Sequence, residues 1–306
     1  MYKIQLGKTG MEVPTIAVGC MRINSLAKNE IDNLIKGAMD MGANFFDHAD
    51  IYAGGECERV FADALDMTPS LREKMIIQTK CGIVPGKMFD FSKEHILEAV
   101  DGSLKRLKTE YIDVLLLHRP DTLMEPEEVG EAFSILKESG KVRHFGVSNQ
   151  NPMQMALLQK YIDMPLCANQ LQMSIMHTPM IQAGINVNML NDSAVNRDGG
   201  VLEYCRLHDI TIQPWSPFQV GFFGGCFVDN KDYPEVNKVL EEIGNKYGVS
   251  KTTMAISWLL RHPAKLMPVT GTTNSTRLTD CLKAVDVKIT REEWYAIYKA
   301  AGNILP

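Results

Sequence analysis

The strongest constraint on the fold of this 306-residue chain is a repeated alternation of short apolar segments with amphipathic ones. We read eight buried strands, each followed by apolar residues at helical spacing. The strands are expected at Thr15–Gly19, Asn44–Asp47, Met75–Thr79, Ile112–Leu117, His144–Ser148, Leu166–Leu171, Ile210–Pro214 and Leu266–Val269. No linker rich in Pro, Gly or Ser divides the chain. The pattern therefore predicts one α/β domain over residues 1–306, a single (β/α)8 TIM barrel.

Additional segments flank this repeat. Tyr2–Leu6 and the residues from Val13 onward surround a Gly-Lys-Thr-Gly turn and predict an N-terminal β-hairpin. Extra C-terminal helices are expected near Thr276–Ala284 and Glu292–Ala301. Two long loops, at roughly 172–198 and 217–232, follow strands and should lie on the active face of the barrel, where they would shape the substrate pocket. The alternative is that they are disordered surface excursions.

The composition excludes several classes of protein. A net charge of -5 without any Lys/Arg-rich block argues against nucleic acid as a partner. No eighteen apolar residues run together, and the first residues lack the apolar core of a signal peptide, so we expect no membrane association. The seven cysteines and seven histidines show no metal-ligand spacing, which predicts reduced thiols, no metal and a cytoplasmic location.

Four polar residues of complementary chemistry lie at or just after the exits of successive strands: Asp47, Tyr52, Lys80 and His118. In a barrel, the carboxyl ends of the strands form the active face, so these side chains should meet there. A lysine held by a carboxylate would lower the pKa of a nearby tyrosine, and a histidine could polarise a carbonyl oxygen. The set predicts a general acid beside an oxyanion site, which suits carbonyl reduction.

Each of these residues also has a structural interpretation. An aspartate after a strand is commonly a turn residue or a helix cap, and a tyrosine there commonly packs its ring. Lys80 could be a solvated charge, and His118 a satisfied histidine near the core. The combination of residue types, order and strand position favours the catalytic interpretation.

The motifs that contain these residues resemble the catalytic signatures of the aldo-keto reductase superfamily, in its bacterial branch of general oxidoreductases. They are Asp47-x4-Tyr52, Gln78-Thr79-Lys80 and Leu116-Leu117-His118-Arg119-Pro120. The resemblance implies NADP(H) bound in an extended pose without a Rossmann domain. It implies Tyr52 as the proton donor, Lys80 and Asp47 as the pair that lowers its pKa, and His118 as the residue that orients the substrate. Asp47 is also expected near the cofactor.

The resemblance extends to cofactor positions. Ser148 and Asn149, in a GVSN segment, and Gln170, after Asn169, are expected to hold the nicotinamide carboxamide. Trp215 should stack on the nicotinamide, and Ser216, Pro217 and Phe218 should meet the pyrophosphate. The adenosine phosphate is assigned to Gly271, Thr272, Thr273 and Arg277, with Arg277 on the 2′-phosphate. Cys281 stands where family members commonly place an adenine-binding asparagine, and Met21 and Arg22 also match cofactor-contacting positions.

The resulting hypothesis is NADPH-dependent reduction of aldehydes or ketones to alcohols, with a small carbonyl compound as the partner. Two alternatives remain open. One is a barrel aldolase that uses Lys80 as a Schiff-base nucleophile. The other is a non-catalytic or redox-sensing regulatory protein that binds a nicotinamide nucleotide. The sequence does not identify the substrate, because no charged anchor for an acidic substrate stands out, and the oligomeric state is equally open.

Overall fold

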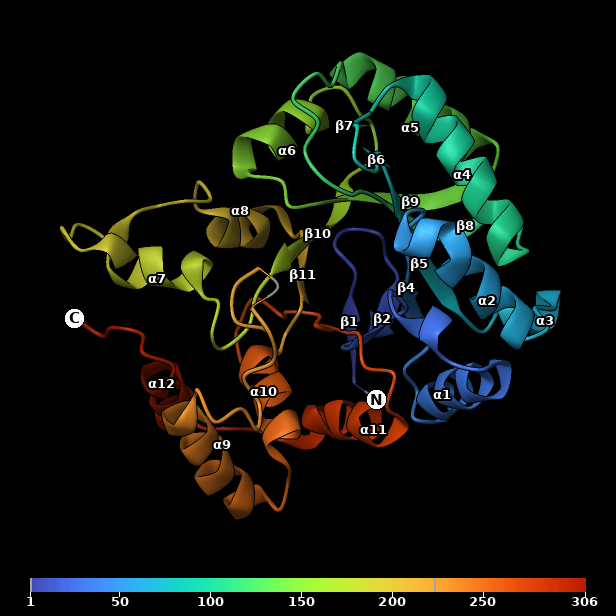
Figure 1. The fold of residues 1–306 in the computed structure, drawn as a ribbon. Coiled ribbons are helices and arrows are strands. Elements are labelled where there is room, and N and C mark those ends of the chain that lie inside the picture. The colour runs from blue at the N-terminus through green and yellow to red at the C-terminus, as the bar shows by residue number, and fades with distance from the viewer. Residues whose placement is uncertain (1, 223) are drawn as a thin grey trace.

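The computed structural model describes residues 2–222 and 224–306 and contains an eight-stranded parallel sheet in the order β11-β10-β9-β8-β5-β4-β3-β12. Its strands are β3 (Ala17–Gly19), β4 (Phe45–Asp47), β5 (Ile76–Cys81), β8 (Ile112–Leu117), β9 (Val142–Ser148), β10 (Leu166–Gln172), β11 (Thr211–Trp215) and β12 (Val269–Thr270). The amide of Met267 donates to the carbonyl of Ile212 at 3.0 Å, which brings the two edges together. The helices form a ring around the strands (Figure 1). The predicted barrel is confirmed.

The strands form where the sequence is continuously apolar, because both faces of each strand are covered. All six residues of β8 are buried, from Ile112 to Leu117. Between β9 and β10 the backbones approach so closely that only glycine fits at position 146. A Cβ there would lie 2.7 Å from the carbonyl oxygen of Ala168 and 2.7 Å from a methyl of Leu116. Gly146 therefore allows the barrel wall to close at this point.

Eight helices of the ring follow the barrel strands in turn. They are α1 (Lys28–Asp40), α2 (Glu56–Ala64), α4 (Lys93–Leu107), α5 (Pro126–Glu138), α6 (Pro152–Gln159), α8 (Val201–His208), α10 (Lys251–Leu260) and α11 (Ser275–Lys283). Side-chain caps start two of these helices: Ser92 accepts from the amide of His95, and Asn151 forms a capping box with Gln154. The second C-terminal helix is α12 (Arg291–Ala300).

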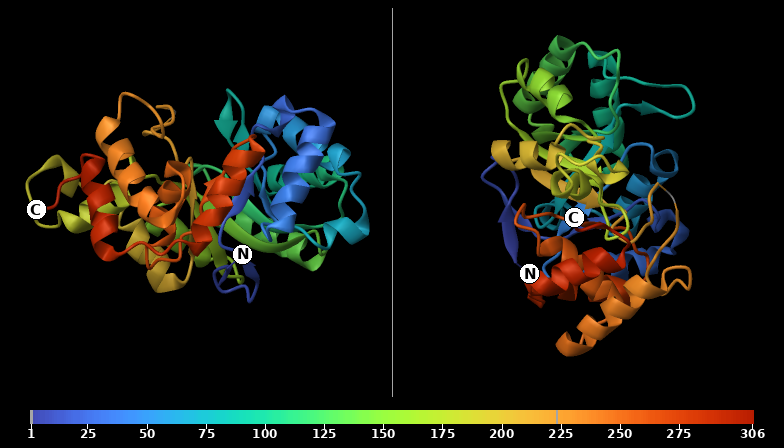
Figure 2. Two further views of the ribbon diagram at one scale, coloured as in Figure 1. Left: turned by 90° about the horizontal axis from the view of Figure 1, so that it is seen from below. Right: turned by 90° about the vertical axis from the view of Figure 1, so that its left-hand side faces the viewer.

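The predicted N-terminal hairpin, β1 (Lys3–Gln5) with β2 (Glu12–Pro14), closes the bottom of the barrel. Leu6 and Val13 are fully buried in a cluster with Phe45 and Leu116 from the barrel interior. In the left panel of Figure 2 this dark blue hairpin lies at the bottom of the molecule. The end of the barrel that would hold a site is therefore the opposite one, where the strands terminate.

The structure corrects the loop predictions. The stretch 172–198 is not an unbroken loop, since it contains α7 (Pro179–Ile185) and a 3-10 turn, η3 (Asp192–Ala194). Residues 217–222 and 224–232 are irregular apart from a bridge between Gln219 and Cys226, and residue 223 lies outside the described residues. Two further helices and one hairpin were not predicted: α3 (Pro69–Arg72), α9 (Pro234–Tyr247) and the hairpin β6 (Ile83–Val84)–β7 (Met88–Phe89).

The β6–β7 hairpin projects from the end of the molecule opposite the N-terminal hairpin (Figure 2, left panel). It follows β5 directly and so borders the end of the barrel where the strands terminate. Within residues 2–222 and 224–306, none of the helices has the length and apolar character needed to cross a membrane.

Candidate active site

Lys80 lies at the centre of a buried polar cluster at the carboxyl end of β5. Its ammonium group donates to the Oδ2 of Asp47 at 2.8 Å, to the carbonyl of His48 at 2.7 Å and to the hydroxyl of Tyr52 at 3.0 Å. The side chain of Lys80 is fully buried, and that of Asp47 is 3% exposed. Three of the four predicted catalytic side chains thus meet through one nitrogen atom.

Asp47 is held by amide donors from the barrel interior. Its Oδ1 accepts from Gln78 at 2.6 Å and from Gln170 at 3.0 Å. Gln213, on β11, accepts from both of these amides and donates back to Gln78. With one carboxylate oxygen on Lys80 and the other on two amides, Asp47 is fully satisfied as an anion.

This arrangement keeps Lys80 charged. Burial lowers the pKa of Lys80, but the carboxylate of Asp47 and the hydroxyl of Tyr52 more than offset it, and the pKa is raised above its usual value. A buried ammonium with this environment acts as a fixed positive charge rather than as a free amine.

Tyr52 is brought to Lys80 by a tight turn after β4. Its amide donates to the carbonyl of Ala49, and the following residues Ala53, Gly54 and Gly55 all have positive φ angles, of 50°, 65° and 91°. Two of these three are glycines, which adopt such angles without strain.

The pKa of Tyr52 is set by opposing effects, of which the sequence predicted only the lowering by Lys80. Burial raises it and the Asp47 carboxylate adds to that effect, whereas the charge of Lys80 lowers it; the net result is a raised pKa. Lys80 therefore limits the effect of burial but does not bring the pKa below its ordinary value. Tyr52 consequently holds its proton at neutral pH.

His118 completes the predicted set at the exit of β8. Its ring centre lies 6.0 Å from that of Tyr52 in an edge-on orientation. Burial, with the charges of Lys80 and Arg119, holds its pKa well below the usual value, so the imidazole is neutral. Its Nδ1 has no hydrogen-bond partner among the described residues. A neutral imidazole here can donate one hydrogen bond to a carbonyl oxygen.

The residues assigned to the nicotinamide form one connected network. The indole of Trp215 donates to Asn149 at 3.1 Å, and Asn149 donates to the hydroxyl of Ser148 at 2.8 Å and to the carbonyl of His118 at 3.3 Å. The hydroxyl of Ser148 and the amide of Asn149 both donate to the carbonyl of Gln170. The structure thus brings these four residues together beside the predicted catalytic set.

The fit of this network to a nicotinamide carboxamide rests on two observations. The amide nitrogen of Gln170 donates to Asp47 and Gln213. No hydrogen bond from the described residues reaches its Oε1, so this oxygen can accept one from a ligand. Asn149 and Ser216 are non-glycine residues with φ angles of 59° and 51°. Such strained conformations concentrate at ligand sites, where the backbone is held for a contact.

The residues assigned to the adenosine phosphate lie between β12 and α11 and in the first turn of α11. Asn274 caps this helix by accepting from the amide of Arg277, and its own amide donates to Thr272. Gly271 and Thr273 lie in the same turn and are half-buried, whereas Arg277 is exposed and forms no ion pair among the described residues. A helix N-terminus with a free guanidinium suits a phosphate group.

The remaining predicted cofactor positions make few side-chain hydrogen bonds that would fix their orientation. Met21 and Arg22 are exposed just after β3, and the carbonyl of Met21 accepts from the thiol of Cys57. Pro217 is buried, and Phe218 is half-buried between the two larger apolar clusters of the core. These positions border the same end of the barrel, and within the described residues no hydrogen bond joins them to Lys80, Asp47 or Tyr52.

Three site residues were missed from the sequence. Gln78 donates to Asp47 and exchanges hydrogen bonds with Gln213. Gln78 carried a signal, because it lies two positions before Lys80 and so faces the same side of its strand. Arg119 follows His118, and its guanidinium carbon lies 5.6 Å from the ring centre of Trp215. Its position beside the nicotinamide residues could not be read from one strand alone.

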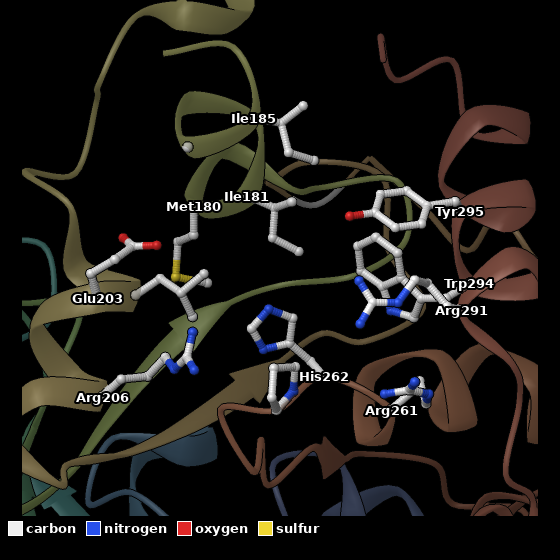
Figure 3. A pocket seen from close by; sticks show the side chains of 13 residues that line it. Met180, Ile181, Ile185, Glu203, Arg206, Arg261, His262, Arg291, Trp294 and Tyr295 are labelled. Atoms are coloured by element: carbon white, nitrogen blue, oxygen red, sulfur yellow. The ribbon is translucent and has the colours of Figure 1, made fainter. Parts of the chain in front are cut away.

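A separate pocket of about 380 Å³ lies on the flank of the barrel. Its walls come from α7, α8, α12 and the segment after α10, and include Arg206, Arg261, His262, Arg291 and Trp294 (Figure 3). It shares no residue with the predicted site. Its three arginines are exposed and therefore solvated, so the pocket by itself gives no argument for a ligand.

Comparison with known proteins agrees with this geometry. The model of the aldo/keto reductase family matches residues 15–301. Two bacterial oxidoreductases are similar over 98% of both chains: YcsN of Bacillus subtilis (strain 168), 36% identical, and YdhF of Escherichia coli (strain K12), 34% identical. A 6-dehydroglucose reductase of Agrobacterium fabrum (strain C58 / ATCC 33970) is 35% identical over 95% of both chains. The crystal structure of the thermostable aldo-keto reductase Tm1743 superposes with a TM-score of 0.78 at 25% identity, covering 98% of this chain and 100% of that one.

The barrel fold and these matches define the class as oxidoreductases with a TIM-like barrel. This chain belongs to the aldo/keto reductase family, as its sequence motifs predicted.

Proposed function

We propose that this protein reduces aldehydes or ketones to alcohols with NADPH, and that Tyr52 is the proton donor. One observation carries the proposal: a single buried ammonium, that of Lys80, bridges the carboxylate of Asp47 and the hydroxyl of Tyr52. A tyrosine held in this way keeps its proton at neutral pH, yet has a cation within hydrogen-bond distance to stabilise the phenolate formed when the proton leaves.

The second catalytic element is His118. As a neutral donor next to Tyr52, it can hydrogen-bond the oxygen of a substrate carbonyl while Tyr52 approaches the same oxygen. The two groups then stabilise the negative charge that develops on that oxygen, and Tyr52 delivers the proton that completes the alcohol. Asp47 acts indirectly, by keeping Lys80 charged and fixed.

The cofactor proposal assigns Ser148, Asn149 and Gln170 to the nicotinamide carboxamide and Trp215 to the face of the ring. When bound, a reduced nicotinamide dinucleotide supplies the two electrons and the hydrogen that the carbonyl carbon accepts. Trp215 is half-exposed and is oriented by its hydrogen bond to Asn149, so its ring presents a defined surface for stacking.

Asp47 and Met21 are assigned to positions beside the nicotinamide. The other cofactor positions are assigned to the phosphates. Ser216, Pro217 and Phe218 would face the pyrophosphate. Gly271, Thr272, Thr273 and Arg277 would hold the adenosine phosphate, with Arg22 near the same end of the barrel. The free guanidinium of Arg277 at the start of α11 supports NADPH over NADH.

Two relatives support carbonyl reduction as the activity. They are named 6-dehydroglucose reductase, from Agrobacterium fabrum (strain C58 / ATCC 33970), and versiconal hemiacetal acetate reductase, from Aspergillus parasiticus, the latter 29% identical over 96% of this chain. The site argues against Lys80 as a Schiff-base nucleophile, because its pKa is raised and its ammonium is spent on three acceptors. A Schiff base requires the neutral amine.

The experiment is steady-state oxidation of NADPH with a panel of aldehydes, ketones and dicarbonyls, together with borohydride treatment of the protein and each carbonyl. The proposal predicts substrate-dependent turnover and no covalent trapping at Lys80. A trapped adduct without NADPH turnover would support the aldolase alternative. Tight nucleotide binding without turnover of any carbonyl would support the regulatory alternative.

A further inference from the structure

We propose that Arg119 anchors the substrate and gives this site a preference for carbonyl compounds that carry an acidic group, such as a carboxylate. The inference rests on the proposed reductase function and names its substrate class. It is drawn from the juxtaposition of an unpaired guanidinium, two aromatic rings and the residue that would hold the carbonyl oxygen.

Arg119 is placed at the mouth of the site by the end of β8. It follows His118, and its guanidinium carbon lies 5.6 Å from the ring centre of Trp215 and 5.8 Å from that of Phe222. The two rings meet edge to face at 6.2 Å. A cation over aromatic faces is attracted by their electron density, so both rings orient this guanidinium without neutralising its charge.

Four other cations near the barrel strands are paired. Lys80 is bound to Asp47, Arg106 to the buried Glu58, and Arg72 and Arg143 to Asp113. Arg119 is half-buried, yet no ion pair or hydrogen bond joins it to any group within residues 2–222 and 224–306.

An unpaired cation in this position has a physical consequence. Arg119 is half-buried, so its charged form is partly shielded from water, and this burial lowers its pKa, although a guanidinium remains protonated at any physiological pH. An anion that binds here would restore the lost interactions. The planar guanidinium matches the two oxygens of a carboxylate, or the oxygens of a phosphate or sulfonate.

The position next to His118 sets where that anion would lie in the substrate. If His118 and Tyr52 hold the carbonyl oxygen, the acidic group of the same molecule can reach Arg119 from a few bonds away. An uncharged carbonyl compound of the same size gains no such contact and leaves the guanidinium partly desolvated. The ratio of kcat/KM for charged and uncharged partners of one shape therefore reports on Arg119.

The test uses two matched pairs of aldehydes: 4-oxobutanoate with its methyl ester, and 4-carboxybenzaldehyde with its methyl ester. In wild-type protein with NADPH, we expect kcat/KM to favour the acid over the ester in at least one pair. Arg119→Gln should lower that acid-to-ester ratio by about tenfold to a hundredfold, the usual span for one lost charge-assisted contact. Arg119→Lys should retain part of the preference, because it keeps the charge but not the two-pronged geometry.

The control is Lys87→Gln, which removes a positive charge from the turn between β6 and β7 and should leave the ratio at its wild-type value. NADPH binding and thermal unfolding are measured for every variant. An acid-to-ester ratio that is the same in wild type and Arg119→Gln would overturn the inference. So would a loss of NADPH binding in Arg119→Gln large enough to explain the fall in kcat/KM for both the acid and the ester.

These outcomes are distinct from failure of the proposed function. Equal reduction of acids and esters by the wild-type protein would leave the reductase standing and remove only the role of Arg119. Absence of any reduction, by a folded protein that binds NADPH, would overturn the reductase proposal and this inference together.

Discussion

The ammonium nitrogen of Lys80 and the hydroxyl oxygen of Tyr52 lie 3.0 Å apart, although 28 residues separate them in the chain. The contact joins a residue of the barrel wall to one in the turn after β4. An apolar side chain at position 80 would supply neither the charge nor the hydrogen bond. Its effect is directional: it favours the ionised form of Tyr52 over the neutral one while burial does the opposite. Catalysis by Tyr52 should therefore depend on Lys80 even though Lys80 need not touch the substrate.

Replacement of Lys80 by methionine removes this charge while it keeps the length of the side chain. Reduction should fall by about 10²–10⁴-fold, the range for a positioned general acid. The pKa of Tyr52 should rise further, so the alkaline decline of the residual activity should move to higher pH. Measurement of kcat against pH checks this, and an unchanged profile at reduced rate would contradict it.

The same variant carries a stability cost that needs its own control. Without Lys80, Asp47 remains buried with only the amides of Gln78 and Gln170 as partners, and an uncompensated buried charge typically costs about 3–5 kcal/mol. The double variant Lys80→Met/Asp47→Asn should recover part of the free energy of unfolding but none of the activity. Recovery of activity as well would show that Lys80→Met acted only through folding.

Asp50 gives the protein a predicted pH dependence of stability. Burial, with the nearby Glu58, raises its pKa to about 7, and its Oδ1 has no partner among the described residues. Because the folded state binds the proton more tightly, the stabilisation is complete below the unfolded pKa and is lost as the pH rises to about 7. As Asp50 ionises between pH 5 and pH 8, the free energy of unfolding should fall by about 2–3 kcal/mol.

Asp50→Asn keeps the shape of the side chain and removes the titration. Denaturant unfolding at pH 5 and pH 8 should show a smaller loss of stability for this variant than for the wild-type protein. Equal losses for the two proteins would mean that Asp50 titrates near its ordinary pKa in the folded state.

Much of the barrel could be predicted because its strands are continuous apolar runs, as in Ile112–Leu117, and because its polar residues stand where those runs end. The layer formed by Gln78, Gln170 and Gln213 could not be assembled from the sequence, since its members come from three strands and meet only after the barrel closes. Local patterns report the face on which a residue lies but not its partner across the barrel.

Of the unpredicted helices, one has clear local sequence signals and another has few. Helix α9 carries readable signals, with Pro234 at its first position and Gly248 just after its end. Helix α7 has only seven residues and contains Gly184, so local preference gives it little support. Lys80 lowers the pKa of Tyr52 as predicted, but the net pKa is raised, because burial, the largest contribution, is not visible in the spacing of Asp47 and Tyr52.

Tryptophan fluorescence can test the nicotinamide assignment, because only Trp215 of the three tryptophans lies at the site. Trp258 and Trp294 stack on each other at 4.7 Å in α10 and α12 and exchange hydrogen bonds with each other's carbonyls. NADPH should quench the emission of the wild-type protein and of Trp294→Phe, whereas Trp215→Ala should lose most of the change. A full signal in Trp215→Ala would show that β11 does not carry the stacking residue.

Cofactor preference is expected to depend on Arg277. Arg277→Ala should weaken NADPH binding by about 1.5–3 kcal/mol, the value of a hydrogen bond to a charged group, and leave NADH binding nearly unchanged. The matched control is Lys283→Ala, near the other end of α11, where the ammonium already faces Asp280. Calorimetric titration of both nucleotides decides the point, since an equal loss for the two would remove the 2′-phosphate from Arg277.

The most direct measurement compares Tyr52→Phe with the wild-type protein for NADPH binding and for turnover of a good aldehyde on the same preparations. The substitution deletes one hydroxyl and keeps the ring, so the protein should fold and bind NADPH as before. We predict that kcat falls by about 10²–10⁴-fold because the proton donor is gone. Turnover within a few-fold of wild type would show that Tyr52 is not the acid, and the proton would then have to come from His118.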